Sequence, residues 1–158
     1  MMNTNKRTAN GLLQLVTFRV EGEEFGVDIL RVQEIIRSME VTRVPKAPDF
    51  VEGVINLRGK VIPIIDLRKR FGIGQKAHDR DTRIIVMEIS SAVVGFVVDS
   101  VSEVLRLPAE TVEPTPSVVA SIDSDYISGV GKLDDRLLIL LELDRLLGAE
   151  EHEMLRAA

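Results

Sequence analysis

The sequence contains an internal duplication, and this duplication limits the folds that the chain can adopt. The segment VEGVINLRGKVIPIIDLRKRFG, residues 51–72, aligns without gaps with ISGVGKLDDRLLILLELDRLLG, residues 127–148. In this alignment Gly53 corresponds to Gly129. A repeat of this kind indicates two copies of one structural unit.

A second pair of similar segments lies upstream in each half. FRVEGEEFGVDILRVQEIIR, residues 18–37, aligns with MEISSAVVGFVVDSVSEVLR, residues 87–106. The matched pairs are Gly26 with Gly95, Val32 with Val101, Glu34 with Glu103 and Arg37 with Arg106. The two segments follow one another in the same order in each half, so the repeated unit has about 60 residues.

Apolar and polar residues alternate through both copies, which is typical of β-strands. Strands are predicted at 12–20, 25–29, 84–89, 93–99 and 101–107, and hairpins at 51–67 and 130–143. Residues 32–36 are ambiguous between a helical turn and a strand, residues 67–71 indicate a short helix ended by Gly72, and another short helix is expected from about residue 144. Because one all-β unit is small for an independent core, we expect the halves to pack together over a shared apolar layer, as two small barrels or sandwiches.

Composition excludes several classes of protein. The 158 residues include no cysteine, which excludes disulfide scaffolds and thiolate metal sites. The net charge of −5 and an aromatic content of 4% argue against a nucleic-acid partner. No apolar run reaches the roughly 18 residues that span a bilayer, so we expect no direct membrane insertion. Residues 1–10 lack the apolar region of a secretory signal, and we expect a disordered tail there and a cytoplasmic protein.

Residues able to carry out a reaction are not grouped in the sequence. His78 lies in a polar linker and His152 near the C-terminus, each without neighbouring ligands. The pair Asp134-Asp135 falls on a predicted turn, where a solvated hairpin tip is the simpler interpretation. We therefore expect no enzyme activity, no metal and no cofactor, and by elimination a function in recognition.

The two hairpin tips differ in charge, although the hairpins correspond. Arg58-Gly59-Lys60 in the first copy aligns with Asp134-Asp135-Arg136 in the second. Arginine is frequent among interface hot spots, so Arg58 is either a recognition residue or an ordinary solvated turn residue. Gly53 and its equivalent Gly129 favour a backbone explanation, such as a bulge or close packing. Glu34 and its equivalent are each compatible with a plain surface carboxylate.

Several of these segments carry a family resemblance. Five segments resemble the CheW family of chemotaxis coupling proteins and follow one another in the order of the family's motifs, from about residue 14 to residue 148. They are VEGVINLRGKVIPIIDLRKRFG, EFGVDILRVQEIIR, TRIIVMEI, VVGFVVDSVSEVLRL and YISGVGKLDDRLLILLELDRLL. The resemblance implies an all-β fold of two SH3-like five-stranded β-barrel subdomains that share a hydrophobic core, with short helices including one near the C-terminus. It places the domain at 11–149, with approximate halves 11–75 and 82–149, and a helical or frayed tail at 150–158.

The same resemblance implies a function. CheW-like proteins are non-enzymatic adaptors that bind the cytoplasmic tip of methyl-accepting chemotaxis receptors and the regulatory domain of the histidine kinase CheA. They are associated with receptor arrays at the inner membrane through these partners. The receptor-binding residues implied here are Arg58, Asn56, Gly59, Gly53, Val32, Glu34 and Val101. The alternatives are an adaptor of a non-flagellar chemosensory pathway and, less favoured, a small β-barrel nucleic-acid-binding protein.

Overall fold

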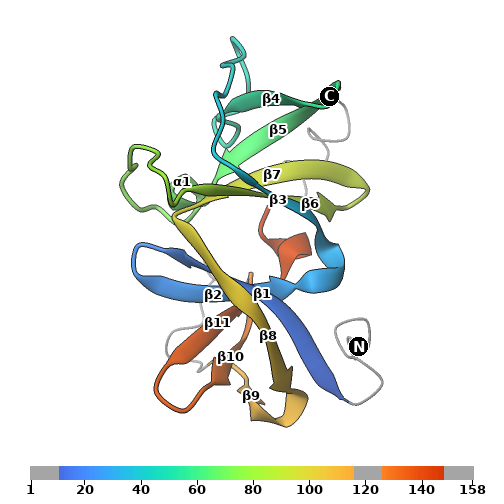
Figure 1. Cartoon of the computed structure of the whole chain (residues 1–158), viewed down its shortest axis with the longest axis vertical. Helices are drawn as coiled ribbons and strands as arrows, with labels where there is room; N and C mark the ends of the chain where they lie inside the picture. The colour runs from blue at the N-terminus through green and yellow to red at the C-terminus, as the bar shows by residue number, and fades with distance from the viewer. Residues whose placement is uncertain (1–10, 116–125, 148–158) are drawn as a thin grey trace.

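Two curled β-sheets lie one above the other along the long axis of the molecule (Figure 1). The structure is a computed structural model that describes residues 11–115 and 126–147. Sheet A has the strand order β8 (Ser100–Pro108), β1 (Leu12–Val20), β2 (Glu23–Asp28), β11 (Leu137–Leu141), β10 (Ile127–Lys132) and β9 (Val112–Glu113). Sheet B has the order β3 (Val32–Arg37), β6 (Arg83–Ile89), β7 (Ala92–Val98), β5 (Lys60–Asp66) and β4 (Gly53–Leu57). The described helices are short: η2 (Ile29–Arg31), α1 (Leu67–Arg70), η3 (Ala109–Thr111) and η5 (Leu143–Arg145).

Each sheet closes into a small barrel. In sheet A, β8 continues through η3 into β9, which pairs with β10. In sheet B, the chain beyond β3 forms a bridge between Thr42 and Val54 on β4. These units are called barrel A and barrel B below. They agree with the predicted SH3-like subdomains, and the two-residue strand β9 is the one addition to five strands in barrel A.

The strand orders of the two barrels confirm the duplication. Strands β8, β1, β2, β11 and β10 correspond, in that order, to β3, β6, β7, β5 and β4. The register agrees as well, because Gly26 lies opposite Leu140 in parallel strands and its equivalent Gly95 lies opposite Ile64 in parallel strands. A Cβ on Gly26 would come within 3.3 Å of Leu140, and one on Gly95 within 2.7 Å of Ile64. Both glycines therefore let a neighbouring side chain pack closely over the strand.

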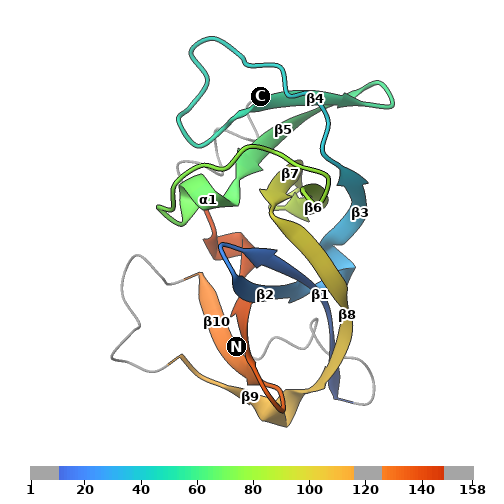
Figure 2. The ribbon, with the colours of Figure 1, turned by 60° about the vertical axis from the view of Figure 1, so that its left-hand side comes forward.

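The barrels do not follow the predicted halves 11–75 and 82–149, and that prediction is wrong. Barrel B is built from consecutive strands, β3 to β7, whereas barrel A combines β1 and β2 with β8 to β11. Figure 2 shows β3 leaving the β1–β2 pair for the upper barrel and β8 returning to the lower one. Each copy of the repeat has thus exchanged its first two strands, β1–β2 for β6–β7, with the other copy, much as identical protomers exchange elements in domain swapping. The predicted tails 1–10 and 150–158 lie outside the described residues.

The main hydrophobic core lies between the barrels, as predicted. It contains buried side chains from both sheets, among them Phe18 and Val20 of barrel A and Met87 and Phe96 of barrel B. A second cluster fills barrel B around Ile64, and a third fills barrel A. Because the largest cluster is shared, the two barrels stabilise one another.

The structure decides the ambiguous segment and confirms the short helix predicted after the first hairpin. The ambiguous segment 32–36 is a strand, β3, whose residues alternate between half-buried and exposed. Helix α1 begins after Asp66, whose Oδ1 accepts a hydrogen bond from the backbone N–H of Arg68 at 3.0 Å. The helix is followed by Gly72 at φ +75°, as predicted for a glycine that ends a helix.

Candidate functional site

The tip of the β4–β5 hairpin is a tight two-residue turn. Arg58 and Gly59 both have positive φ, at 53° and 87°, as in the type I′ turns that suit twisted hairpins. Asn56 reinforces the turn, because its Oδ1 accepts a hydrogen bond from the N–H of Gly59 at 2.9 Å. Sequence and local geometry together present the Arg58 side chain on a rigid support, with 69% of it exposed.

The Arg58 guanidinium makes a bidentate pair with Glu34. Nη1 donates to Oε2 at 3.0 Å, and Nη2 donates to Oε1. Glu34 lies on β3, at the opposite edge of sheet B from β4, so the ion pair joins the two edges of the barrel. Hydrogen bonding to Arg58 lowers the pKa of Glu34, and the same bonds raise the pKa of Arg58. Both groups are therefore charged at neutral pH.

A shallow hollow lies beside this pair. Its lining combines apolar and charged side chains, namely Gln33, Glu34, Leu57, Arg58, Lys60, Ile62, Val86 and Val93. Two exposed apolar residues, Ile35 and Val61, lie on the strands that border it. A surface with a charged anchor next to apolar side chains is typical of protein recognition sites.

Gly53 lies at the other end of β4 from the hairpin tip and has a packing role. A Cβ at this position would come within 2.3 Å of the carbonyl oxygen of Thr42, so only glycine fits. A Cβ at its equivalent, Gly129, would lie 3.0 Å from the carbonyl oxygen of Glu113. The predicted backbone explanation for both glycines is confirmed, because each allows the segment that closes its barrel, at Thr42 or on β9, to approach.

Val32 and Val101 are half-buried and pack against the core between the barrels. They stand at equivalent places, just after the chain has crossed from one barrel to the other. Of the seven predicted site residues, the structure brings Asn56, Arg58, Gly59 and Glu34 together at the tip of barrel B. It places Gly53 at the far end of β4 from this tip, and Val32 and Val101 against the core between the barrels.

Barrel A has a similar ion pair that the sequence analysis missed, although its arginine, Arg136, is the repeat equivalent of Lys60 and not of Arg58. Arg136, at the β10–β11 tip, donates from Nη2 to Glu103 at 2.9 Å and from Nε to the buried Glu24 at 2.7 Å. Glu103 is the repeat equivalent of Glu34, and each hairpin tip carries one arginine, although the two arginines stand two positions apart in the alignment. This partial correspondence was the signal for the second pair. The exposed residues Asp134 and Asp135 occupy the solvated tip, as expected.

The histidines and acidic residues form no metal site in the part of the chain that the structure describes. His78 Nδ1 lies 2.6 Å from Ser38 Oγ, and His152 is outside the described residues. Within 11–115 and 126–147, no helix is long and apolar enough to cross a membrane.

Comparisons with known proteins agree with this architecture. The family model described as the CheW-like domain matches residues 14–151. A chemotaxis protein CheW from Klebsiella aerogenes is 44% identical over 138 residues, which cover 87% of this chain and 83% of that protein. A chemotaxis protein CheW from Rhizobium meliloti is 40% identical over 155 residues, which cover 97% of this chain and 99% of that protein.

A solved structure shows the same likeness. The crystal structure of the scaffolding protein TtCheW from Thermoanaerobacter tengcongensis has a TM-score of 0.77 and 42% sequence identity to this chain. The match covers 84% of this chain and 90% of that one. The protein described here therefore belongs to the CheW family of chemotaxis proteins.

Proposed function

We propose that this protein is a non-enzymatic cytoplasmic adaptor that couples methyl-accepting chemotaxis receptors to the histidine kinase CheA. Membership of the CheW family supports the adaptor role. The related TtCheW is itself described as a scaffolding protein. The adaptor makes and breaks no covalent bond, and it acts by holding its two partners together.

The observation that carries the proposal is the exposed Arg58 on its rigid turn. The guanidinium has five N–H donors. Glu34 accepts hydrogen bonds from Nη1 and Nη2, and the remaining donors can bind a partner. The neighbouring hollow adds apolar contact through Leu57 and Val93. Because the turn is already ordered, docking a receptor tip here costs little conformational entropy.

We propose that the kinase regulatory domain, a related double barrel, packs against a barrel surface. Barrel A exposes Val104 on β8 and Leu137 on β11. These residues are the repeat equivalents of Ile35 and Val61 in barrel B, which are also exposed. Apolar residues exposed at equivalent places on two barrels suit packing of one barrel against another.

The test begins with calorimetric titration of the protein into the isolated regulatory domain of a CheA kinase from the same genome. We expect saturable binding near one to one. Absence of binding to every such domain, from a protein shown to be folded, overturns the adaptor proposal.

The receptor side is tested with Arg58→Glu. We expect receptor-tip binding to weaken roughly thirtyfold or more, as for loss of an interface hot spot. Kinase binding and the melting temperature should stay as in the native protein. Arg80→Glu, the same charge change at an exposed residue of the segment between α1 and β6, is the matched control and should leave receptor binding unchanged. Native receptor affinity in a folded Arg58→Glu variant contradicts the receptor assignment.

A further inference from the structure

Within the described residues, the chain passes between the barrels twice. The first crossover runs from β2 through η2 to β3, and the second runs from β7 through Asp99 to β8. The two crossovers are equivalent under the repeat. Each carries an ion pair between an arginine and an aspartate, and these two contact sites are called the Arg68 joint and the Arg31 joint.

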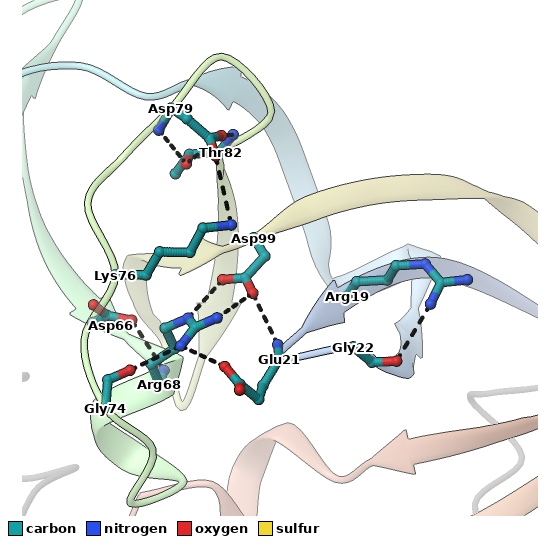
Figure 3. A network of polar contacts seen from close by, with 10 residues as sticks. All are labelled: Arg19, Glu21, Gly22, Asp66, Arg68, Gly74, Lys76, Asp79, Thr82 and Asp99. Carbon is teal, nitrogen blue, oxygen red and sulfur yellow. Dashed lines mark hydrogen bonds and ion pairs between the residues drawn. The ribbon is translucent and has the colours of Figure 1, made fainter.

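The Arg68 joint is centred on a guanidinium that is only 11% exposed (Figure 3). Arg68 of α1, in barrel B, donates from Nε to Asp99 Oδ1 at 2.9 Å and from Nη2 to Asp99 Oδ2 at 2.7 Å. Its Nη1 lies 2.8 Å from the carbonyl oxygen of Gly74 and 2.7 Å from Oε1 of Glu21. Arg68 thus holds the second crossover, the segment after α1 and a turn of barrel A at the same time.

Glu21 brings the β1–β2 turn of barrel A into this joint. Its backbone has φ +54°, a left-handed conformation that is costly for a residue with a side chain. The N–H of Glu21 donates to Asp99 Oδ2 at 2.9 Å, while its carboxylate pairs with Arg68. The joint therefore holds both the backbone and the side chain of the turn. Hydrogen bonds from Arg68 lower the pKa of Asp99, so its carboxylate is charged at neutral pH.

The Arg31 joint is more exposed to solvent than the Arg68 joint. Arg31 of η2 donates from Nη2 to Asp144 Oδ1 at 2.7 Å and from Nε to the carbonyl oxygen of Glu88 at 3.1 Å. The side chains of Arg31 and Asp144 are 28% and 50% exposed. Exposed ion pairs are screened by water and salt, whereas bidentate pairs with little exposure are stronger.

The repeat shows why the joints differ. Asp144 is the equivalent of Arg68, so the polarity of the second ion pair is reversed. The β6–β7 turn, equivalent to the β1–β2 turn, has Ser90 where barrel A has Glu21. Serine carries no negative charge, so this turn has no carboxylate with which to join a charged cluster. The duplicated chain therefore keeps one strong joint and one weak one.

We propose that the Arg68 joint is the fixed pivot that sets the relative orientation of the two barrels, and that the Arg31 joint is the side that opens when they rock. The shared core around Phe18 and Phe96 keeps the barrels in contact, so the motion is a small rotation and not a separation. This device stands apart from the proposed adaptor function, because it concerns the free protein.

The absence of cysteine makes a direct test possible. Val61→Cys on β5 and Leu137→Cys on β11 place one spin label on an exposed strand position of each barrel. Pulsed electron–electron double resonance then gives the distribution of distances between the labels. In this background, Asp99→Asn is compared with Asp144→Asn, which is the same substitution at the equivalent ion pair.

We expect Asp99→Asn to broaden the distance distribution about twofold, because the bidentate pair with Arg68 and the carboxylate acceptor of the Glu21 N–H are both weakened. Asp144→Asn should leave its width close to native, because the exposed pair contributes little to the orientation. Equal broadening by both variants, or a native distribution in folded Asp99→Asn, overturns the proposal. If Asp99→Asn does not fold, Arg68→Lys keeps the charge but lacks the planar fork, and the same outcomes apply to it.

Discussion

The Arg58 guanidinium and the Glu34 carboxylate join the β4–β5 turn to the edge strand β3 of barrel B, and Arg136 and Glu103 join the β10–β11 turn to the edge strand β8 of barrel A. The repeated pairing shows that one role of Arg58 is to close its barrel. The two arginines differ in exposure, with 69% of the Arg58 side chain accessible against 39% for Arg136, which also pairs with the buried Glu24. Arg58 is therefore the tip arginine with more of its surface open to a partner.

Replacement of Glu34 by glutamine tests the positioning of Arg58. The pair is exposed, so Glu34→Gln should leave the melting temperature near neutral pH close to native. Receptor-tip binding should weaken, but less than with Arg58→Glu, because the guanidinium remains and loses only its orientation. Glu103→Gln is the matched control and should leave receptor binding unchanged. Binding of Glu34→Gln as tight as that of the native protein would show that Glu34 does not position Arg58.

The two equivalent glycines should differ in their tolerance of alanine. Gly53→Ala should lower the free energy of unfolding by about 2–3 kcal/mol, because its Cβ would meet a backbone oxygen at 2.3 Å. Gly129→Ala should cost about 1 kcal/mol, because its closest contact, at 2.9 Å, is a Val112 side chain that can shift, and the nearest backbone oxygen, that of Glu113, is 3.0 Å away and not 2.3 Å. Urea denaturation measures both values. Gly74→Ala, where a Cβ meets nothing within 4 Å, is the control and should be nearly neutral.

Asp66 predicts a pH dependence of opposite sign to that of Asp99. Burial raises the pKa of Asp66 above its ordinary value, so the folded protein binds this proton more tightly than the unfolded chain does. The resulting stabilisation is present at low pH and is lost as pH rises through the raised pKa. Asparagine caps a helix about as well as aspartate. Asp66→Asn should therefore become more stable than the native protein as pH rises from about 4 to about 7.

Asp66→Ala separates the cap from the charge. It should show the same pH trend as Asp66→Asn but be less stable by about 1 kcal/mol throughout, because the hydrogen bond to the N–H of Arg68 is lost. Thermal melts over this pH range give the comparison. A stability difference between Asp66→Asn and native that does not change with pH rules out a raised pKa for this carboxyl.

Phe71 connects α1 to barrel A through a stack of aromatic rings. Its ring centroid is 5.1 Å from that of Phe25 and 5.5 Å from that of Tyr126. Phe71→Ala should cost about 2 kcal/mol, less than for a fully buried phenylalanine because Phe71 is half-buried. Tyr126 is the one tyrosine of a chain without tryptophan, so its fluorescence reports on this stack.

Phe50→Ala is the control for Phe71→Ala. Phe50 also packs against the shared core, but it is outside the stack formed by the described rings. We expect the fluorescence of folded Phe71→Ala to change and that of Phe50→Ala to stay native. Native Tyr126 fluorescence in Phe71→Ala contradicts the stacked arrangement.

The sequence by itself determined the local structure. Alternation of apolar residues predicted the strands, and Arg58-Gly59 predicted a tight hairpin turn, because these features depend on residues that are close together in the chain. The repeat predicted two matching units over a common core, and the strand orders of the barrels confirm it. The equivalence of Gly53 and Gly129 correctly indicated close backbone packing.

Only the tertiary structure decided how the copies are connected. Apolar alternation predicts that β8 is a strand and leaves the β3 segment ambiguous, and it does not say with which copy either segment pairs, because an exposed strand edge accepts either neighbour. The exchange of the β1–β2 and β6–β7 pairs between the copies then creates the two crossovers and the ion pairs at them. The contacts of Arg58 with Glu34 and of Arg68 with Asp99 join residues 24 and 31 positions apart in sequence. Neither follows from local pattern, because a surface charge finds its partner only after the barrels have closed.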